Sequence, residues 1–235
     1  MPKMSGIMAI IALLLIALFI LIPVGAQSWL PELPGEATRI DRFESEIKAF
    51  EKSDQASPVK PGETLFVGSS TFRLWDDFNG DFSDVHGVNR AFGGATIDEI
   101  NHYANRIVIP YKPSRIVFYA GTNDLAEGDS AKQVYDDFMR FERLVHSKLP
   151  RTKIFFLSAS PGPIRVHMQK SYEDVNRLVF EEARRSGKFK FVDIRPVMYE
   201  NGKLRKDYFG FDRLHMNKRG QEAWKPVIKS ALKDR

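Results

Sequence analysis

From Glu63 onwards, short apolar runs alternate with longer amphipathic stretches. The apolar runs are typical of strands and cover Thr64–Val67, Val85–Phe92, Ile116–Ala120, Ile154–Ser158 and Phe189–Ile194. The stretches with helical spacing are Thr71–Phe78, Ile97–Val108, Ala131–Leu149, Ser171–Ser186 and Lys218–Leu232. Strands that are apolar on both faces and alternate with helices form parallel sheets covered on two sides. The pattern therefore predicts an α/β fold, a three-layer α/β/α sandwich around a five-stranded parallel sheet.

An uninterrupted apolar segment lies ahead of this alternation. Ile7–Ile22 contains no polar residue, Lys3 precedes it, and the acidic residues Glu32 and Glu36 follow it. A basic flank on this side predicts that the N-terminus stays in the cytoplasm and that the rest of the chain is translocated. We therefore expect an N-terminal hydrophobic helix and an extracytoplasmic domain, periplasmic or secreted.

Two outcomes stay open for residues 1–26, a cleaved signal peptide or a retained membrane anchor. Val24–Ala26 offers small residues suited to signal peptidase. The apolar stretch is long for a cleaved signal, because at about 1.5 Å per residue it reaches roughly 24–31 Å, nearly the thickness of a bilayer core. Residues 27–36 contain prolines and a glycine and are typical of a linker. The folded domain is therefore expected to span residues 37–235.

The first amphipathic stretch of this domain is Arg39–Lys52. Ile40, Phe43, Ile47 and Phe50 follow helical spacing, and the polar positions carry four basic and four acidic residues. A helix that lies on a membrane surface has a basic polar face. The balanced charge therefore predicts a helix docked on the domain.

Composition excludes several function classes. The 235 residues include 35 basic and 30 acidic ones, for a formal charge of +5, and the two signs are interspersed. No basic stripe of the kind that binds nucleic acid is present in the sequence. The lack of cysteine excludes a thiol nucleophile, a disulfide framework and cysteine metal sites.

Glycine and polar residues follow the apolar runs. The segments are Gly68–Ser70, Phe92–Thr96, Gly121–Asp124 and, before the last helix, Phe211–Asn217. Ligand sites of open parallel sheets form at the carboxyl ends of the strands. Taken singly, each segment has an ordinary interpretation as a turn, a helix cap or a surface charge pair. A metal needs at least three ligands and no HExxH motif is present, so we expect no metal at Asp212 and His215.

Taken together, the four segments contain the parts of serine acyl transfer. That reaction requires a nucleophile, a base, a group that orients the base, and donors for the oxyanion. Ser70, at a helix N-terminus, is the candidate nucleophile, and His215 is the candidate base. Asp212 lies three residues upstream of His215 and can accept a hydrogen bond from the other imidazole nitrogen. Gly94 offers a backbone N–H for the oxyanion, and Asn123 offers a side-chain amide.

In this order, the four blocks resemble those of the SGNH (GDSL-like) hydrolases. The match extends from Leu65 to about Ala231. Leu65–Ser70 and Gly121–Asp124 look most like the branch that contains platelet-activating-factor acetylhydrolase subunits and lysophospholipase-like esterases. The resemblance implies a flavodoxin-like fold and a serine ester hydrolase that uses no metal or cofactor.

The resemblance also implies roles for individual residues. Ser70, Asp212 and His215 are expected to form the catalytic triad. The oxyanion hole is expected to consist of the Ser70 amide, Gly94 and Asn123.

Two other serines could be mistaken for the nucleophile. Gly128-Asp129-Ser130 is a literal Gly-Asp-Ser, but no strand precedes it, and Ser130 with Gln133 fits a capping box. Ser69 stands where the SGNH family usually has Asp, which supports the loop rather than the chemistry. Neither Ser69 nor Ser70 has Glu or Gln three residues later, which disfavours a purely capping role.

The loop after the fourth apolar run reaches the same edge of the sheet. Arg165 is expected there as a pocket residue that meets a polar or anionic substrate group, and His167 as a second pocket residue. Core positions, rather than an acyl pocket, are predicted for Phe72, Trp75, Phe92 and Tyr119. His102 and His146 lie in helix-like stretches and are expected to be surface or packing residues.

The sequence predicts a class of reaction more sharply than a substrate. A small ester, a lipid ester such as a lysophospholipid, and an O-acetyl ester of an acylated glycan all fit an open crevice on this fold. If residues 6–26 are retained, they also bring the domain to a membrane. The alternative is a membrane-tethered, non-catalytic binding or assembly module on the same fold.

Overall fold

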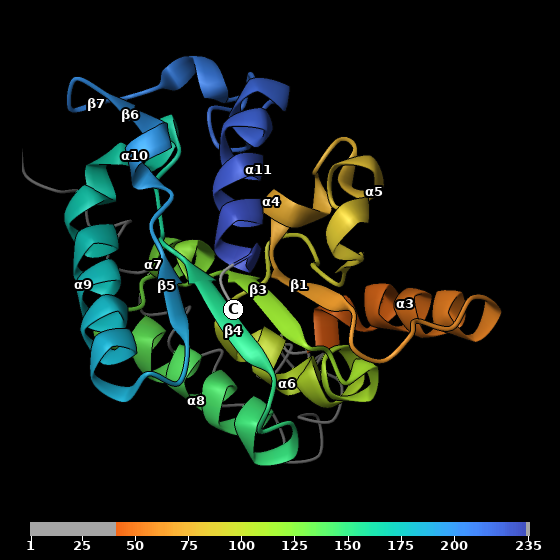
Figure 1. Cartoon of the computed structure of the whole chain (residues 1–235). Helices are drawn as coiled ribbons and strands as arrows, with labels where there is room; N and C mark the ends of the chain where they lie inside the picture. Colours follow the sequence, from red (N-terminus) through yellow and green to blue (C-terminus); the bar gives the residue numbers. More distant parts are fainter. Residues whose placement is uncertain (1–40, 234–235) are drawn as a thin grey trace, which may run out of the picture. The chain divides into compact units, whose positions relative to one another are not determined.

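A parallel sheet forms the centre of the protein in the computed structural model, which describes residues 41–233 (Figure 1). Its five strands lie in the order β2-β1-β3-β4-β5. They span Thr64–Gly68 (β1), Gly87–Asn89 (β2), Arg115–Tyr119 (β3), Lys153–Leu157 (β4) and Lys190–Val192 (β5). The predicted five-stranded α/β fold, with its flavodoxin-like strand order, is therefore confirmed.

The predictions for residues 1–26 and 27–36, including the N-terminal hydrophobic helix, lie outside the described residues. Among residues 41–233, no helix is both long enough and apolar enough to span a membrane.

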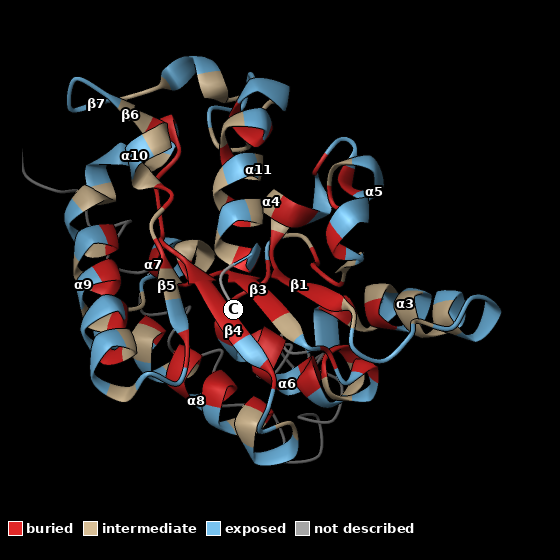
Figure 2. Ribbon diagram, viewed as in Figure 1, coloured by how far each residue is buried: buried red, intermediate tan, exposed pale blue. Residues whose placement is uncertain are grey.

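Alternate strand residues pack into two apolar clusters, one on each face of the sheet. Leu65 and Phe118 belong to the first cluster, whereas Phe66 and Val117 belong to the second. The helices of the first face are α3 (Glu44–Ala56), α6 (Ile97–Ile107), α8 (Ala131–Lys148) and α9 (Gln169–Ser186). Those of the second are α4 (Ser70–Arg73), α5 (Phe78–Asp81), α10 (Arg195–Met198) and α11 (Lys218–Lys233). Figure 2 shows the central strands buried and the helices exposed on their outer sides.

Helix α3 docks on the first face through its apolar side. Phe43, which precedes it in the short η2 helix (Asp41–Phe43), and Ile47 are buried in the core. Arg106 on α6 binds Glu44 and Glu51 of α3 at 2.6 and 2.7 Å. A docked helix was predicted here, but α3 begins and ends about one turn later than Arg39–Lys52.

Two predicted elements differ in the structure. The run Val85–Phe92 contributes only the edge strand β2, because Ser83–Val85 forms a 3-10 turn (η3) and His86 is left-handed, with φ of 51°. The stretch predicted as one helix over Thr71–Phe78 ends at Arg73, and a second short helix, α5, starts at Phe78.

The remaining elements are short connections between these layers. They are the 3-10 helices η4 (Ile109–Tyr111), η5 (Pro163–Met168) and η6 (Lys206–Tyr208), helix α7 (Thr122–Glu127), and the antiparallel pair β6 (Tyr199–Glu200) and β7 (Lys203–Leu204).

The strand order reverses direction between β1 and β3. The chain leaves β1 into α4, which packs on the second face, and leaves β3 into α7, which contacts α8 and α9 on the first. A crevice opens at the carboxyl ends of strands where the order reverses in this way. The crevice lies next to Ser70 and Asn123, the first residue of α4 and the second residue of α7.

The two central strands approach each other closely at this edge. Gly68 is paired with Tyr119, and a Cβ on Gly68 would lie 2.2 Å from the Tyr119 carbonyl oxygen. Only glycine therefore fits at the end of β1 without moving the neighbouring strand.

We expect Gly68→Ala to destabilise the fold by about 1–3 kcal/mol, the usual cost of overpacking. Urea unfolding of the full chain measures the change. Gly210→Ala is the matched control, because the nearest atom to a Cβ there lies 3.6 Å away. Equal free energies of unfolding for the two variants would contradict the steric argument.

Candidate active site

Ser70 is the serine that the fold presents to a histidine. Its Oγ lies 2.9 Å from Nε2 of His215, although the two residues are 145 positions apart. Ser69 occupies the N-cap position of α4, but its side chain accepts no hydrogen bond from the helix and is buried. The turn after β1 therefore directs Ser70, and not a capping serine, towards the crevice.

Asp212 and His215 lie on one tight turn before α11. Asp212 Oδ2 is 2.6 Å from His215 Nδ1, and its Oδ1 accepts from the backbone N–H groups of Leu214 and His215 at 2.9 and 3.0 Å. The Gly210 N–H donates to the His215 carbonyl at 2.8 Å and closes the turn. Base and carboxylate are thus held by a segment of six residues, Gly210–His215.

Hydrogen bonds keep the Asp212 carboxylate charged. The backbone N–H groups of Leu214 and His215, and then the His215 side chain, lower the pKa of Asp212 to about 2. The side chain is half-exposed, at 51%, so donors rather than burial determine its charge. Because its pKa is lowered, any stability from the carboxylate is complete above about pH 4 and is lost as the pH falls through about 2.

The charged carboxylate fixes the role of each imidazole nitrogen. Ionised Asp212 is an acceptor only, so His215 Nδ1 must carry the hydrogen that bridges them. In the neutral ring, Nε2 then bears a lone pair, and it faces the Ser70 hydroxyl. This arrangement can take a proton from Ser70.

Asn123 is held on both sides of its amide. Its Nδ2 donates to the Ala95 carbonyl at 3.0 Å, and Arg165 Nη1 donates to its Oδ1 at 3.2 Å. The guanidinium identifies Oδ1 as the oxygen, so the NH₂ group faces the Ala95 loop. An NH₂ group has two hydrogens, and Ala95 engages one of them. The other can donate to an oxyanion.

Arg165 lies at the pocket, as predicted, but its guanidinium also binds protein groups. It borders the cavity beside Ser70, but its Nη1 binds Asn123 and the Thr122 carbonyl, at 3.2 and 3.1 Å. His167 is exposed on the same 3-10 helix, η5, and is not among the residues that line the cavity. The structure thus brings Arg165, but not His167, to the site.

Gly94 lies in the loop that Asn123 contacts. Its φ is +81°, a conformation that favours glycine, and no atom lies within 4 Å of the place a Cβ would take. Arg42 Nη2 donates to the Gly94 carbonyl at 3.2 Å. Gly94 does not itself line the cavity, and the link to the site runs through the bond from Asn123 to Ala95.

Asp124, the residue after Asn123, also links the turn after β3 to the loop that follows β2. Its Oδ1 accepts from the N–H of Ile97, the first residue of α6, at 2.8 Å. Burial raises the pKa of the Asp124 carboxyl to about 7. Thr96 and Glu99 complete a capping box at the start of α6. The loops after β2 and β3 are therefore bonded together by two consecutive residues, Asn123 and Asp124.

A small cavity of about 30 Å³ lies between these groups. Ser70, Asn123, Arg165 and His215 border it, together with residues that the sequence did not indicate: Tyr119, Ser160, Met198, Phe209, Leu214, Met216 and Trp224. Tyr119 is both a buried core residue, as predicted, and part of the wall, where its ring meets Trp224 with centroids 4.8 Å apart.

The predictions about neighbouring side chains are confirmed. Phe72, Trp75 and Phe92 are buried in the core and do not line the cavity. Ser130 caps α8 in a capping box with Gln133. His146 is a packing residue, with Nδ1 2.6 Å from Glu142 and Nε2 3.0 Å from the Thr152 carbonyl.

The sequence profile of the GDSL-like lipase/acylhydrolase family matches residues 61–223. The match covers most of the chain, including the turns that carry Ser70, Asn123 and His215. The chain therefore belongs to the GDSL-like lipase/acylhydrolase family, and it is a carboxylic ester hydrolase.

Solved structures share the fold at low sequence identity. A GDSL-like lipase from Bacteroides thetaiotaomicron is 21% identical, with a TM-score of 0.64 over 82% of this chain and 96% of that one. A member of the lipolytic G-D-S-L family from Veillonella parvula is 15% identical, with a TM-score of 0.64 over 74% and 99%. An acetyl-xylooligosaccharide esterase from Geobacillus is 17% identical, with a TM-score of 0.57 over 75% and 97%. No curated protein matches the sequence.

We expect Asp212→Asn to lower kcat by about 10³–10⁴-fold, the order seen when such a carboxylate is removed from a serine hydrolase. The amide N–H would face His215 Nδ1, so the ring would carry its hydrogen on Nε2 and could not accept from Ser70. Steady-state kinetics on a short-chain ester measure the effect.

Asp207→Asn is the control for this variant. Asp207 lies on η6, a few residues before the same turn, and pairs with Arg205 instead of a histidine. Loss of activity in both variants would indicate a general disturbance of the segment rather than a change of tautomer.

Proposed function

We propose that the protein is a serine esterase in which Ser70 is the nucleophile, His215 the general base and Asp212 the group that orients His215. The observation that carries the proposal is the continuous contact from Ser70 Oγ to His215 Nε2 at 2.9 Å and from His215 Nδ1 to Asp212 at 2.6 Å. The Ser70 and Gly94 backbone N–H groups and the Asn123 amide are the proposed oxyanion donors.

The proposed reaction has two balanced halves. Ser70 Oγ bonds to the ester carbonyl carbon while its proton moves to His215 Nε2. The tetrahedral oxyanion then collapses, the ester C–O bond breaks, and Nε2 gives the proton to the departing alcohol. Water attacks the acyl-serine in the same way and releases the carboxylic acid. Asp212 stabilises the imidazolium that forms in each half.

The size of the cavity favours a short acyl group. At about 30 Å³ the cavity is small and suits an acetyl group better than a long acyl chain. Buried side chains of Tyr119 and Trp224 form part of its wall. One relative of the same fold is an acetyl-xylooligosaccharide esterase. We therefore propose O-acetyl esters, such as those of an acetylated glycan, as substrates.

A lipid ester is the second candidate, favoured by apolar side chains outside the cavity. Phe211 is fully exposed next to Asp212, and Ile164 and Val166 are about half-exposed on either side of Arg165. A lipid substrate would place its acyl chain along this rim rather than in the cavity.

We also propose an extracytoplasmic location, from the charge pattern around Ile7–Ile22. The mass of the protein purified from cells tests processing, because cleavage after Ala26 would remove residues 1–26.

A fluorophosphonate probe tests the nucleophile. We expect the full-length protein to be labelled once, Ser70→Ala to lose labelling completely, and Ser130→Ala to be labelled as strongly as the wild type. Ser130 is the matched control because it lies in the literal Gly-Asp-Ser and caps α8. Labelling of Ser70→Ala would exclude Ser70 as the nucleophile, and an unlabelled wild type would favour a non-catalytic binding module.

A series of p-nitrophenyl esters tests the acyl group. We expect kcat/KM to fall at least tenfold between acetyl and octanoyl, because the longer chain does not fit the cavity. A rise in kcat/KM with chain length would favour the lipid ester and the apolar rim instead.

A further inference from the structure

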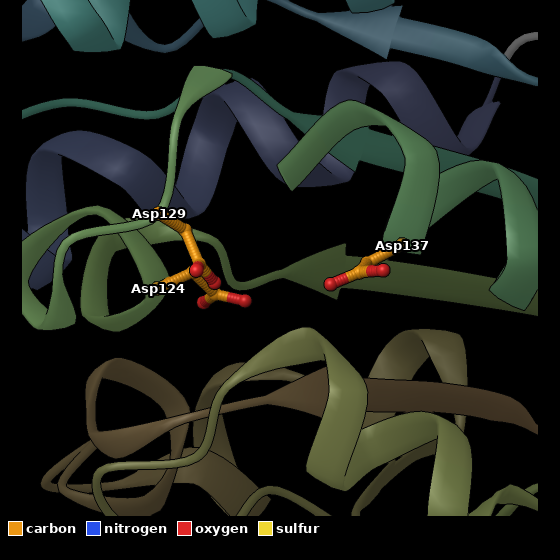
Figure 3. A group of neighbouring side chains, drawn as sticks. All are labelled: Asp124, Asp129 and Asp137. Atoms are coloured by element: carbon orange, nitrogen blue, oxygen red, sulfur yellow. The ribbon is translucent and has the colours of Figure 1, made fainter. Parts of the chain in front are cut away.

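Three carboxylates gather next to the turn that carries Asn123. They belong to Asp124 on α7, Asp129 in the following loop and Asp137 on α8, and each offers one oxygen within 4.8 Å of the other two. Figure 3 shows Asp124 and Asp129 side by side, with Asp137 pointing towards them from α8. None of the three lines the cavity beside Ser70.

One oxygen of this group is buried without a partner. Asp124 is fully buried, and while its Oδ1 accepts from the Ile97 N–H, its Oδ2 has no hydrogen bond within the described structure. Burying a carboxylate without a compensating charge or donor is expensive. Arg140 pairs with one member of the group, Asp137, and with Asp98, but it makes no bond to Asp124.

A second buried oxygen near the group also has no hydrogen-bond donor in the described structure. Asn101 on α6 donates from Nδ2 to the Asp137 carbonyl at 3.0 Å, which places it beside the group. Its Oδ1 is buried and unpartnered in the part of the chain that the structure describes. Asp129 and Asp137 each accept a bond, from Gln133 Nε2 and from Arg140, whereas the two buried oxygens, Asp124 Oδ2 and Asn101 Oδ1, have no donor in the described part of the chain.

We infer that Asp124, Asp129 and Asp137 form a calcium-binding site. All the ligand atoms are carboxylate oxygens, the donors that hard divalent cations prefer. Calcium binds oxygen at about 2.3–2.6 Å, so ligands on opposite sides of the ion are up to roughly 5 Å apart, and the group fits that span. Magnesium demands near-ideal octahedral geometry and gives up its own waters reluctantly, so a group of three protein carboxylates suits it less well than calcium.

A bound calcium ion would stabilise the fold next to the site and would not take part in the ester hydrolysis. Asp124 follows Asn123 and accepts from the first N–H of α6, so a cation on its free oxygen would fix α7, which carries Asn123, against α8. Asp129 and Asp137 are half-buried, which leaves room for water to complete the coordination.

Calorimetric titration of the full-length protein in detergent micelles, after treatment with EDTA and desalting, tests the site. With CaCl₂ we expect one ion per chain and a Kd below about 1 mM, in the range of extracellular calcium modules. With MgCl₂ we expect binding at least tenfold weaker. The thermal midpoint should also rise with calcium, because an ion that binds only the folded state stabilises it.

Matched variants locate the ion. Asp129→Asn and Asp137→Asn should each raise the Kd for calcium at least tenfold. Asp136→Asn is the control, because Asp136 neighbours Asp137 on α8 but points to Lys132 and lies outside the group. Asp124→Asn keeps an acceptor for the Ile97 N–H and should remove the effect of calcium on the thermal midpoint.

Two results would overturn the inference. Absence of saturable heat and of any thermal shift at 10 mM CaCl₂ would mean that a proton, not a cation, neutralises Asp124. Wild-type affinity in both Asp129→Asn and Asp137→Asn would place calcium elsewhere. The inference is independent of the proposed esterase chemistry, since Ser70→Ala should bind calcium as the wild type does.

Discussion

The reversal of strand order between β1 and β3 is the constraint on which the site depends. It sends α4 and α7 to opposite faces of the sheet, so the turns that carry Ser70 and Asn123 border one crevice. The close approach of Gly68 to the Tyr119 carbonyl fixes the spacing of these two turns. The C-terminal part of the chain adds the turn Gly210–His215, which places His215 next to Ser70.

Two carboxylates near the crevice have pKa values shifted in opposite directions. Asp212 lies on an exposed turn, and backbone N–H groups keep it charged, with a pKa of about 2. Asp124 is buried between α6 and α7, and burial raises its pKa to about 7. Both accept hydrogen bonds from the backbone, but only Asp212 also faces a basic side chain. Their surroundings therefore suit them to different tasks: Asp212 orients a base, and Asp124 joins the loops after β2 and β3.

Much of the fold and part of the candidate site could be predicted from the sequence. Both central strands and the large helices follow from periodicity, and Ser70, Asn123 and His215 follow from their places after strands or before a helix. The break between α4 and α5 was missed because the apolar spacing continues through it. Trp224 gave no signal, since a core residue and a cavity wall on α11 have the same pattern. Asp124, Asp129 and Asp137 match no ligand motif, and only the packing of α7 against α8 brings them together.

The tight turn from Gly210 to His215 has a consequence for motion in the protein. The hydrogen bonds that orient His215 and charge Asp212 all lie within this turn, whereas a single contact joins it to Ser70. A displacement of the segment would therefore carry the base and its carboxylate together as one rigid piece. Such a displacement would change the distance between Ser70 Oγ and His215 Nε2 and leave the contacts between His215 and Asp212 as they are.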